Sequence, residues 1–387
     1  MKKLTEITKC YGCTACMNIC PKKCISMQTN EKGFKYPVID KEKCIDCGLC
    51  HKICPANNTV VKDNACKIVY AAKHKDISVI KQSTSGGVFT ALSDYVLNEK
   101  GVIYGTKLSE EMKVTYTRVT TKKERDNLRG SKYVQSDLKD TFSELKKDLE
   151  NQKTVLFVGN PCYVAGLKSY LKKDYPNLIL CDIVCHGVPS PLIFEEHIKL
   201  INSKDKIKKY IFRDKSVGWR GTNVTIEYGN KKESNTEFSS IFSNLYFDGY
   251  ISRENCATCK FTSVNRVSDI TIGDFWGIEK NSELNKINDE KGINLVMINT
   301  NKGSEIFEKI SSDIVFLQSE VENCLQPQLQ YPAKQNTKKD AFWNDYYNKG
   351  FIYVSKKYTS YGLKNKIFKL IKKMIPRKIK NILKRGN

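Results

Sequence analysis

The sequence contains no apolar run that approaches the ~18 residues a helix needs to span a membrane. Residues 1–9 carry basic side chains but lack the apolar segment of a secretory signal peptide. These two absences argue against an integral membrane protein and against an exported one. We therefore expect a soluble protein of the reducing cytoplasm.

Acidic residues are scarce, with 42 Asp and Glu against 65 Lys and Arg, so the formal net charge is +23. A basic balance favours an acidic protein, an anionic lipid surface or nucleic acid as partner. Because we find no nucleic-acid-binding motif, we expect no nucleic acid partner. The chain also has no long low-complexity tract, and its 387 residues, 40% of them hydrophobic, are enough for two or more domains with real cores.

Cysteine is abundant, with 16 residues in the chain. Two short segments, residues 10–21 and 44–55, follow the pattern C-x2-C-x2-C-x3-C-P, which bacterial ferredoxins use to bind 4Fe-4S clusters. Three thiolates with two residues between each can reach three irons from one loop. The fourth iron takes the last cysteine of the other segment. The predicted ligands are Cys10, Cys13, Cys16 and Cys54 for one cluster, and Cys44, Cys47, Cys50 and Cys20 for the other.

Two other uses of these cysteines fit the pattern less well. A zinc ion takes four ligands and does not require two sets of four cysteines, each followed by proline. A disulfide framework needs an oxidising compartment, which nothing in the sequence indicates. Cys24 and Cys66 lie outside both segments, and we interpret each as a small buried apolar residue.

The chain after residue 65 alternates between expected strands and helices. Continuous apolar strands at residues 154–158 and 178–184 predict a parallel or mixed sheet that helices cover on both faces. Cys162 follows the first of these strands, and Cys185 and His186 follow the second, where the ligand crevice of such sheets lies.

A further C-x2-C pair, Cys256 and Cys259, needs two more soft ligands to complete a metal site. Cys162 and Cys185 are the paired candidates at strand ends, whereas Cys181 lies within a strand and Cys324 is distant in the sequence. From this chemistry alone, a third metal site and four unrelated buried thiols remain open alternatives.

Two polar stretches could bind an anion. Residues 83–87 form a Ser/Gly loop before an expected helix, where free backbone N–H groups suit a phosphate, although an ordinary capped helix would look the same. Residues 129–136 combine two cations, two hydroxyls, a glycine and an amide with a tyrosine. This second set suits a phosphate next to an aromatic ring.

The C-terminal tail is strongly basic. From Lys356 to the end it has twelve Lys or Arg and no Asp or Glu, together with apolar residues at helical spacing that Pro376 should interrupt. Such a helix can lie on the anionic inner face of the cell membrane, or it can dock on the protein as a solvated helix. Both interpretations stay open.

Taken in order, these features resemble the coenzyme F420 hydrogenase/dehydrogenase beta-subunit family, in the arrangement with an N-terminal dicluster ferredoxin domain. The resemblance covers Cys10 to about Gly277 and does not include the tail. Together with the features above, it gives an α+β protein with a ferredoxin domain at 1–64, an α/β domain with a mixed sheet at 65–350 that the resemblance implies is flavin-binding, and a basic amphipathic helical tail at 351–387. The matching motifs are 83–87 (STSGG), 130–136 (GSKYVQS), 159–162 (GNPC), 185–187 (CHG), 256–259 (CATC) and 269–274 (DITIGD).

The resemblance also implies cofactors for the α/β domain, because members of the family hold FAD there and can carry a further 4Fe-4S cluster. The implied ligands of this third cluster are Cys162, Cys185, Cys256 and Cys259. The implied FAD contacts are Ser83, Thr84, Ser85, Gly86, Gly87, Gly130, Ser131, Lys132, Tyr133, Gln135 and Asn160.

The function implied by the resemblance is that of an FAD- and iron-sulfur-dependent oxidoreductase. Electrons would pass from a ferredoxin or another acidic donor through the clusters to FAD, and on to a small-molecule or lipid-linked acceptor, with cell-surface polysaccharide synthesis as one setting. His186 would protonate the product, or alternatively shape its own loop through a hydrogen bond. Two other interpretations are a non-catalytic electron-transfer subunit of a larger redox complex, and a subunit that reduces or oxidises the deazaflavin coenzyme.

Overall fold

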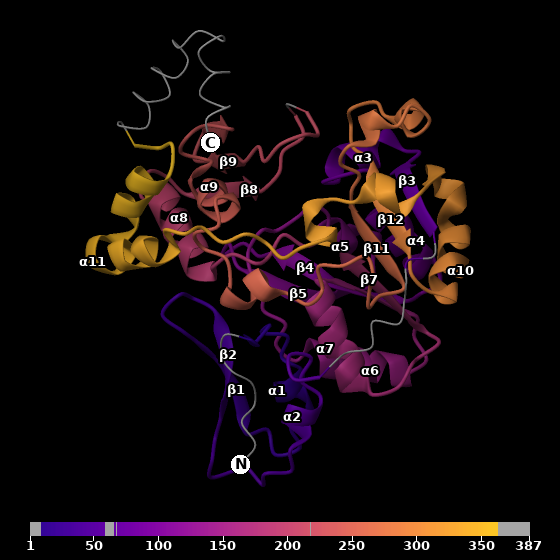
Figure 1. Ribbon diagram of the computed structural model, residues 1–387, viewed down its shortest axis with the longest axis horizontal. Helices are drawn as coiled ribbons and strands as arrows, with labels where there is room; N and C mark the ends of the chain where they lie inside the picture. Colours follow the sequence, from indigo (N-terminus) through magenta and orange to yellow (C-terminus); the bar gives the residue numbers. More distant parts are fainter. Residues whose placement is uncertain (1–8, 59–65, 67, 217, 363–387) are drawn as a thin grey trace. The chain divides into compact units, whose positions relative to one another are not determined.

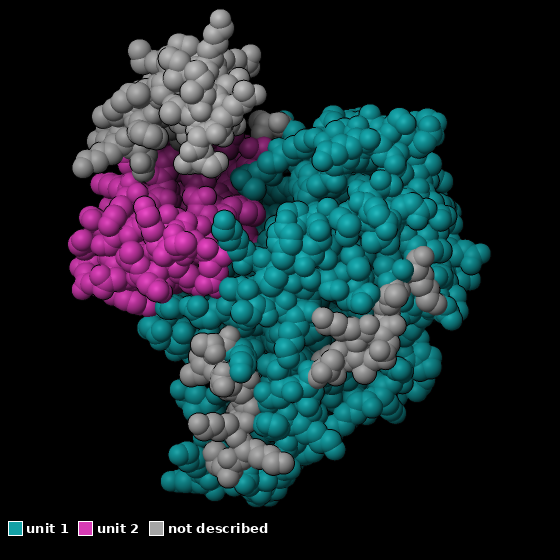
Figure 2. Space-filling model, viewed as in Figure 1, with its two compact units in different colours: residues 1–192, 212–222, 252–334 teal, residues 193–211, 223–251, 335–387 magenta. Residues whose placement is uncertain are grey.

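The computed structural model describes residues 9–58, 66, 68–216 and 218–362 (Figure 1). The chain divides into two compact units, shown in different colours in Figure 2. Unit 1 comprises residues 1–192, 212–222 and 252–334, and unit 2 comprises residues 193–211, 223–251 and 335–387. The ferredoxin-like segment therefore falls in the same unit as the large sheet.

The strands are β1 (Ile25–Thr29), β2 (Lys35–Ile39), β3 (Ile68–His74), β4 (Val102–Leu108), β5 (Val114–Val119), β6 (Val155–Gly159), β7 (Leu178–Ile183), β8 (Ile207–Ile211), β9 (Thr225–Tyr228), β10 (Lys231–Ser234), β11 (Ile270–Asp274), β12 (Asn294–Ile298) and β13 (Ile314–Ser319). The α-helices are α1 (Ala15–Ile19), α2 (Leu49–Lys52), α3 (Ile77–Gln82), α4 (Val88–Asn98), α5 (Lys122–Asp126), α6 (Thr141–Glu150), α7 (Pro161–Leu171), α8 (Pro191–Asn202), α9 (Ile241–Phe247), α10 (Asn301–Ile310) and α11 (Lys339–Tyr358).

Unit 1 is built on an eight-stranded mixed sheet in the order β13-β3-β12-β11-β7-β6-β4-β5. The four strands β4, β6, β7 and β11 are parallel, and the strands on either side of them pair antiparallel. The mixed sheet expected from the sequence is therefore confirmed. Because the carboxyl ends of β6, β7 and β11 meet at one edge, the residues that follow these strands are brought together.

Both faces of the sheet are covered, as the continuous apolar strands predict. Along β6, Val155 and Phe157 pack into a core with α6 and α7, while Leu156 between them packs with α4 on the other face. This alternation follows from the two-residue period of a strand. Buried apolar side chains on two faces therefore fix the register of the strands that carry the site.

The ferredoxin-like segment of unit 1 contains the hairpin β1–β2 and the short helices α1 and α2. Tyr11, Ala15 and Ile53 belong to the same buried cluster as α6 and α7, so the segment shares a core with the sheet. Polar contacts add to this packing: the Lys35 ammonium lies 2.6 Å from an Asp137 carboxylate oxygen.

Unit 2 contains the antiparallel sheet β10-β9-β8 with α9, α11 and most of α8. Its interior is aromatic, and the rings of Phe194 and Phe242 meet edge to face at 5.1 Å. Helix α11 is interrupted at Gly350, where φ is +76°. The first part of the predicted basic tail, which begins at residue 351, is helical up to Tyr358. The predicted kink at Pro376 lies outside the described residues.

No helix within the described residues is both long enough and apolar enough to cross a membrane.

Candidate functional site

Four cysteines line a first cavity at the start of unit 1. They are the predicted set Cys10, Cys13, Cys16 and Cys54. The last cysteine of segment 44–55 therefore lies beside three cysteines of segment 10–21. The Gly12 N–H donates to the Cys10 sulfur at 3.3 Å. Desolvation by burial raises the pKa of the Cys13 thiol to about 12. A buried thiol with a raised pKa is a poor nucleophile.

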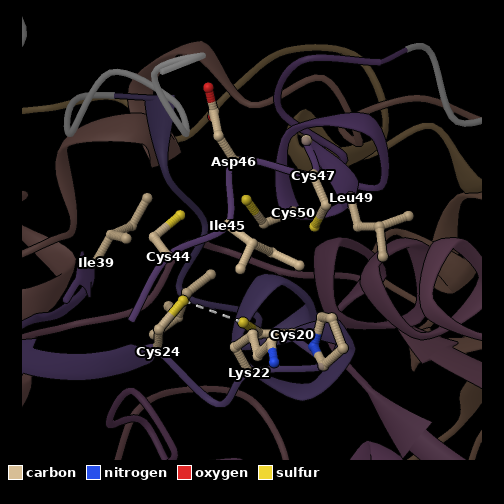
Figure 3. Close-up of a pocket in the computed structure, with 13 residues that line it drawn as sticks. Cys20, Lys22, Cys24, Ile39, Cys44, Ile45, Asp46, Cys47, Leu49 and Cys50 are labelled. Carbon is tan, nitrogen blue, oxygen red and sulfur yellow. Dashed lines mark hydrogen bonds between the residues drawn. The ribbon is translucent and has the colours of Figure 1, made fainter. Parts of the chain in front are cut away.

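A second cavity is lined by five cysteines (Figure 3). Four of them, Cys20, Cys44, Cys47 and Cys50, are the predicted second set, and Cys24 is the fifth. Cys24 is buried, as expected, but it faces thiols rather than an apolar core, since its sulfur lies 3.3 Å from that of Cys20.

The structure brings Cys162, Cys185, Cys256 and Cys259 together around a third cavity. Cys162 stands in the first turn of α7, directly after β6, and Cys185 follows β7. The other two come from the short 3-10 helix Glu254–Thr258 and the residue after it. Strand ends and a distant turn therefore supply one thiol set from three parts of the sequence.

Gly187 is needed for this arrangement. It has a φ of +90°, and a Cβ placed there would lie 3.2 Å from the Cys256 Cβ. Cys181, by contrast, packs within the strand against the opposite core, away from the third cavity. The sequence-based choice of Cys185 over Cys181 thus matches the placement of both thiols.

Each cavity is lined by the four thiols that a cuboidal iron-sulfur cluster uses. Among the described residues, no three His, Cys, Asp or Glu side chains converge closely enough to hold one ion. A cuboidal cluster takes one thiolate on each of four separated irons, so its ligands are spread more widely than the four that surround a zinc ion.

The first and third cavities are neighbours. Tyr11 lines both of them, and its ring packs edge to face on Phe261 at 5.3 Å. Arg253, which also lines the third cavity, donates to the Cys10 carbonyl at 2.8 Å and to the Gln135 side chain at 2.9 Å. A buried cation and an aromatic ring therefore contact both cysteine sites.

The two polar stretches predicted to contact FAD also meet. The Ser131 N–H donates to the Thr84 hydroxyl at 2.7 Å. Gly86 packs tightly, since a Cβ there would lie 2.6 Å from the Ala72 carbonyl oxygen, and Gly87 adopts a φ of +90° ahead of α4. The Ser85 hydroxyl donates to the Ile293 carbonyl at 2.7 Å. Ser83 likewise donates to a carbonyl, that of Val79, so the loop is held by its own hydroxyls.

The remaining predicted FAD contacts are dispersed. The Lys132 ammonium donates to three backbone carbonyls, those of residues 127, 128 and 129, at the end of α5. Its burial lowers the pKa of Lys132 to about 7. Tyr133 packs edge to face on Phe212 at 6.3 Å. Gln135 lies beside Arg253, and Asn160 lines the third cavity instead.

Sequence reasoning missed an ion pair at the same edge of the sheet. The Arg213 guanidinium binds the carboxylate of Asp274, the last residue of β11, and the Trp219 indole N–H donates to that carboxylate at 2.8 Å. The charges of Asp274 and Arg213 both act on the His186 imidazole, but burial has the largest effect and lowers its pKa. Asp274 stood within a recognised motif, whereas nothing in the sequence marks Arg213.

Comparisons with known proteins agree with this architecture. Residues 9–58 match the 4Fe-4S dicluster domain, residues 69–142 match the "Coenzyme F420 hydrogenase/dehydrogenase, beta subunit N-term" model, and residues 152–323 match the corresponding C-terminus model.

No curated protein matches the chain in sequence. Among solved structures, a chain of the F420-reducing [NiFe] hydrogenase complex from Methanosarcina barkeri is similar, with 16% identity and a TM-score of 0.47, over 78% of this chain and 92% of that one. The two family models together span more than half of the sequence. The chain therefore belongs to the coenzyme F420 hydrogenase/dehydrogenase beta-subunit family and carries an N-terminal 4Fe-4S dicluster domain.

Proposed function

We propose that this chain is an iron-sulfur, flavin-binding electron-transfer subunit of an oxidoreductase. In this proposal two 4Fe-4S clusters lie in the ferredoxin-like segment, a third lies at the ends of β6 and β7, and FAD binds near the Ser/Gly loop. One observation carries it: the twelve predicted cysteine ligands, which come from separate parts of the sequence, line three cavities, four at each.

Bound iron-sulfur clusters and a flavin supply one-electron and two-electron transfer, and the protein positions and tunes them. The chain's own contribution begins with the thiols and the backbone that holds them. Glycine at position 12 lets the first loop approach Gln135 and Arg253, since a Cβ there would lie 2.7 Å from the Gln135 amide nitrogen. Tyr11 then forms the shared wall that keeps the first and third thiol sets close.

The groups near the Ser/Gly loop would bind and orient a flavin. The support is local: Thr84 and Ser131 hold the two loops together, and the backbone at Gly87 leads into the positive end of α4. Burial lowers the pKa of His186, which favours its neutral imidazole, a proton acceptor, beside the Arg213–Asp274 pair. A purely structural role for His186 is the alternative.

The family description favours a subunit over a self-sufficient enzyme. The family is one of beta subunits, which supports the electron-transfer interpretation more than the complete oxidoreductase that the sequence alone favours. The same description supports the deazaflavin coenzyme as the molecule reduced or oxidised. Turnover of the purified chain with an artificial donor and this coenzyme distinguishes the subunit from the complete enzyme. Turnover without any partner chain would favour the complete enzyme.

Three narrower expectations stay predictions. An acidic donor such as ferredoxin rests on the net charge of +23, and contact with an anionic membrane rests on the tail. A setting in cell-surface polysaccharide synthesis rests on the family resemblance alone.

The third cluster is the most direct test of the proposal. In Cys256→Ser, we expect the loss of one cluster, about four irons per chain, while the two ferredoxin-type signals persist in the electron paramagnetic resonance (EPR) spectrum. Cys181→Ser is the matched control. Cys181 is buried, but it is not among the residues that line the three cysteine cavities. Full iron content in Cys256→Ser would remove the third cluster from the proposal.

A further inference from the structure

The second cavity holds one thiol more than a 4Fe-4S cluster uses. Cys20, Cys44, Cys47 and Cys50 are the predicted ligands, and Cys24 lines the same cavity with only 5% of its surface exposed. Figure 3 shows the five sulfur atoms gathered around one space, with those of Cys20 and Cys24 joined by an interaction. The first cavity differs, since only four of its described lining residues are cysteines.

The backbone brings Cys24 to this position. The chain turns directly after Cys20, with the Lys23 N–H donating to the Cys20 carbonyl at 3.1 Å and Lys23 itself at a φ of +49°. The Cys24 carbonyl then accepts from the Asp40 N–H at 2.8 Å, at the open end of the hairpin β1–β2. A turn and a hairpin therefore hold the Cys24 side chain against Cys20.

Two sulfur atoms 3.3 Å apart cannot both bind iron at separate corners of one cube. Each corner takes its own thiolate, and the four thiolates are spread around the cluster. One member of the pair is then a ligand, and the other stays a thiol whose S–H points toward a negatively charged sulfur. The C-x2-C-x2-C-x3-C-P pattern assigns the ligand role to Cys20.

We propose that the Cys24 thiol donates an S–H···S hydrogen bond to the Cys20 thiolate and thereby raises the reduction potential of the second cluster. Hydrogen bonds to the sulfurs are one of the factors that set cluster potentials, because they stabilise the more negative, reduced state. This inference rests on the proposed clusters, and it gives two otherwise similar ferredoxin-type sites different potentials.

The test is a potentiometric titration followed by EPR on anaerobically purified full-length protein, comparing wild type with Cys24→Ala. We expect unchanged iron content and a lower midpoint potential for one cluster. The reduction equilibrium should shift by up to about tenfold, which is about 59 mV for a one-electron step. Cys24→Ser, which keeps a donor, should recover part of the difference. Cys181→Ala is the control, with no shift expected.

Two results would overturn the inference. Unchanged potentials in Cys24→Ala at full iron content would mean that the thiol does not tune the cluster. Loss of about four irons would mean that Cys24 is itself a ligand, in place of Cys20.

If Cys24→Ala does not fold, wild-type protein still gives an answer. The Fe–S(Cys) vibrations should shift after exchange into D2O, because the donated proton exchanges, and their insensitivity would contradict the inference. Failure of the proposed function looks different from either case, since wild-type protein would then contain no iron-sulfur clusters at all.

Discussion

Asp182 and Arg266 form a buried ion pair beside the third cavity. Their side chains are 0% and 1% exposed, and the guanidinium lies 3.0 Å from the carboxylate. The Thr271 hydroxyl also donates to this carboxylate at 2.6 Å, and Arg266 donates to the Phe261 carbonyl. The pair thereby ties the end of β7 to the segment that follows Cys259.

We predict that Arg266→Leu destabilises the protein strongly, because it leaves the Asp182 charge buried without its partner. Breaking such a pair costs about 3–5 kcal/mol in the free energy of unfolding. The matched control is Arg220→Leu, since Arg220 pairs with Glu279 at 43% and 40% exposure and an exposed pair contributes about 1 kcal/mol or less. Urea denaturation measures both. Equal midpoints for the two variants would show that the buried pair is not a stabilising element.

A buried histidine in unit 2 makes stability depend on pH. His197 is 0% exposed, its Nε2 lies 3.2 Å from the Phe238 carbonyl, and its Nδ1 has no partner among the described residues. Burial lowers the pKa of His197 to about 4. The side chain is therefore neutral in the folded state, with Nε2 as the donor.

We predict that the opening free energy of α8 falls on acidification. In the unfolded chain a histidine binds a proton below pH ~6.5, whereas the folded state does so only near pH 4, so stability is complete above pH 6.5 and is lost toward pH 4. Between pH 7 and pH 5 the loss is about 2 kcal/mol. Hydrogen exchange of the α8 amides measures it. His197→Phe should flatten this dependence, and an equal slope in that variant would exclude His197 as the cause.

At the scale of elements, α7 approaches the first cysteine loop closely. A Cβ at Gly166, within this helix, would lie 2.8 Å from the Cys13 sulfur. A glycine inside a helix ordinarily costs about 1 kcal/mol relative to alanine. The close approach explains why glycine occupies this position.

We predict that Gly166→Ala reduces the iron content by about four per chain, because the added methyl group displaces the Cys13 thiol. Lys168→Ala, in the same helix, should keep its full iron content. Iron analysis together with EPR measures both variants. A fully loaded Gly166→Ala protein would show that the loop can move away from the helix without losing a ligand.

The elements also show what the sequence could predict. Strand-end logic predicts Cys162 and Cys185 at one edge of the sheet, and both line the third cavity there, because apolar strands are easy to recognise and their carboxyl ends converge in a parallel sheet. Strand β12, whose five residues are all buried, was not predicted. The Arg213–Asp274 pair was missed for another reason: it joins segments sixty-one residues apart, and only the folded sheet brings them together.

At the scale of the whole molecule, the positive charge should govern the encounter with a donor. With a net charge of +23, the chain should be reduced rapidly by an acidic ferredoxin at low ionic strength. We predict that the second-order rate falls about tenfold or more between low salt and 0.5 M salt, since screening shortens the range of attraction. Stopped-flow reduction measures this rate, with a neutral dye reductant as control. A rate that salt does not change would argue against an acidic donor.

The central claim is that one chain carries three iron-sulfur clusters and a flavin. Anaerobic purification of the full-length protein, with iron, sulfide and flavin quantified per chain, tests it most directly. The account predicts about twelve irons, about twelve sulfides and one FAD. About eight irons without flavin would contradict it, because only the ferredoxin-like segment would then be loaded and the third cysteine cavity would need another explanation.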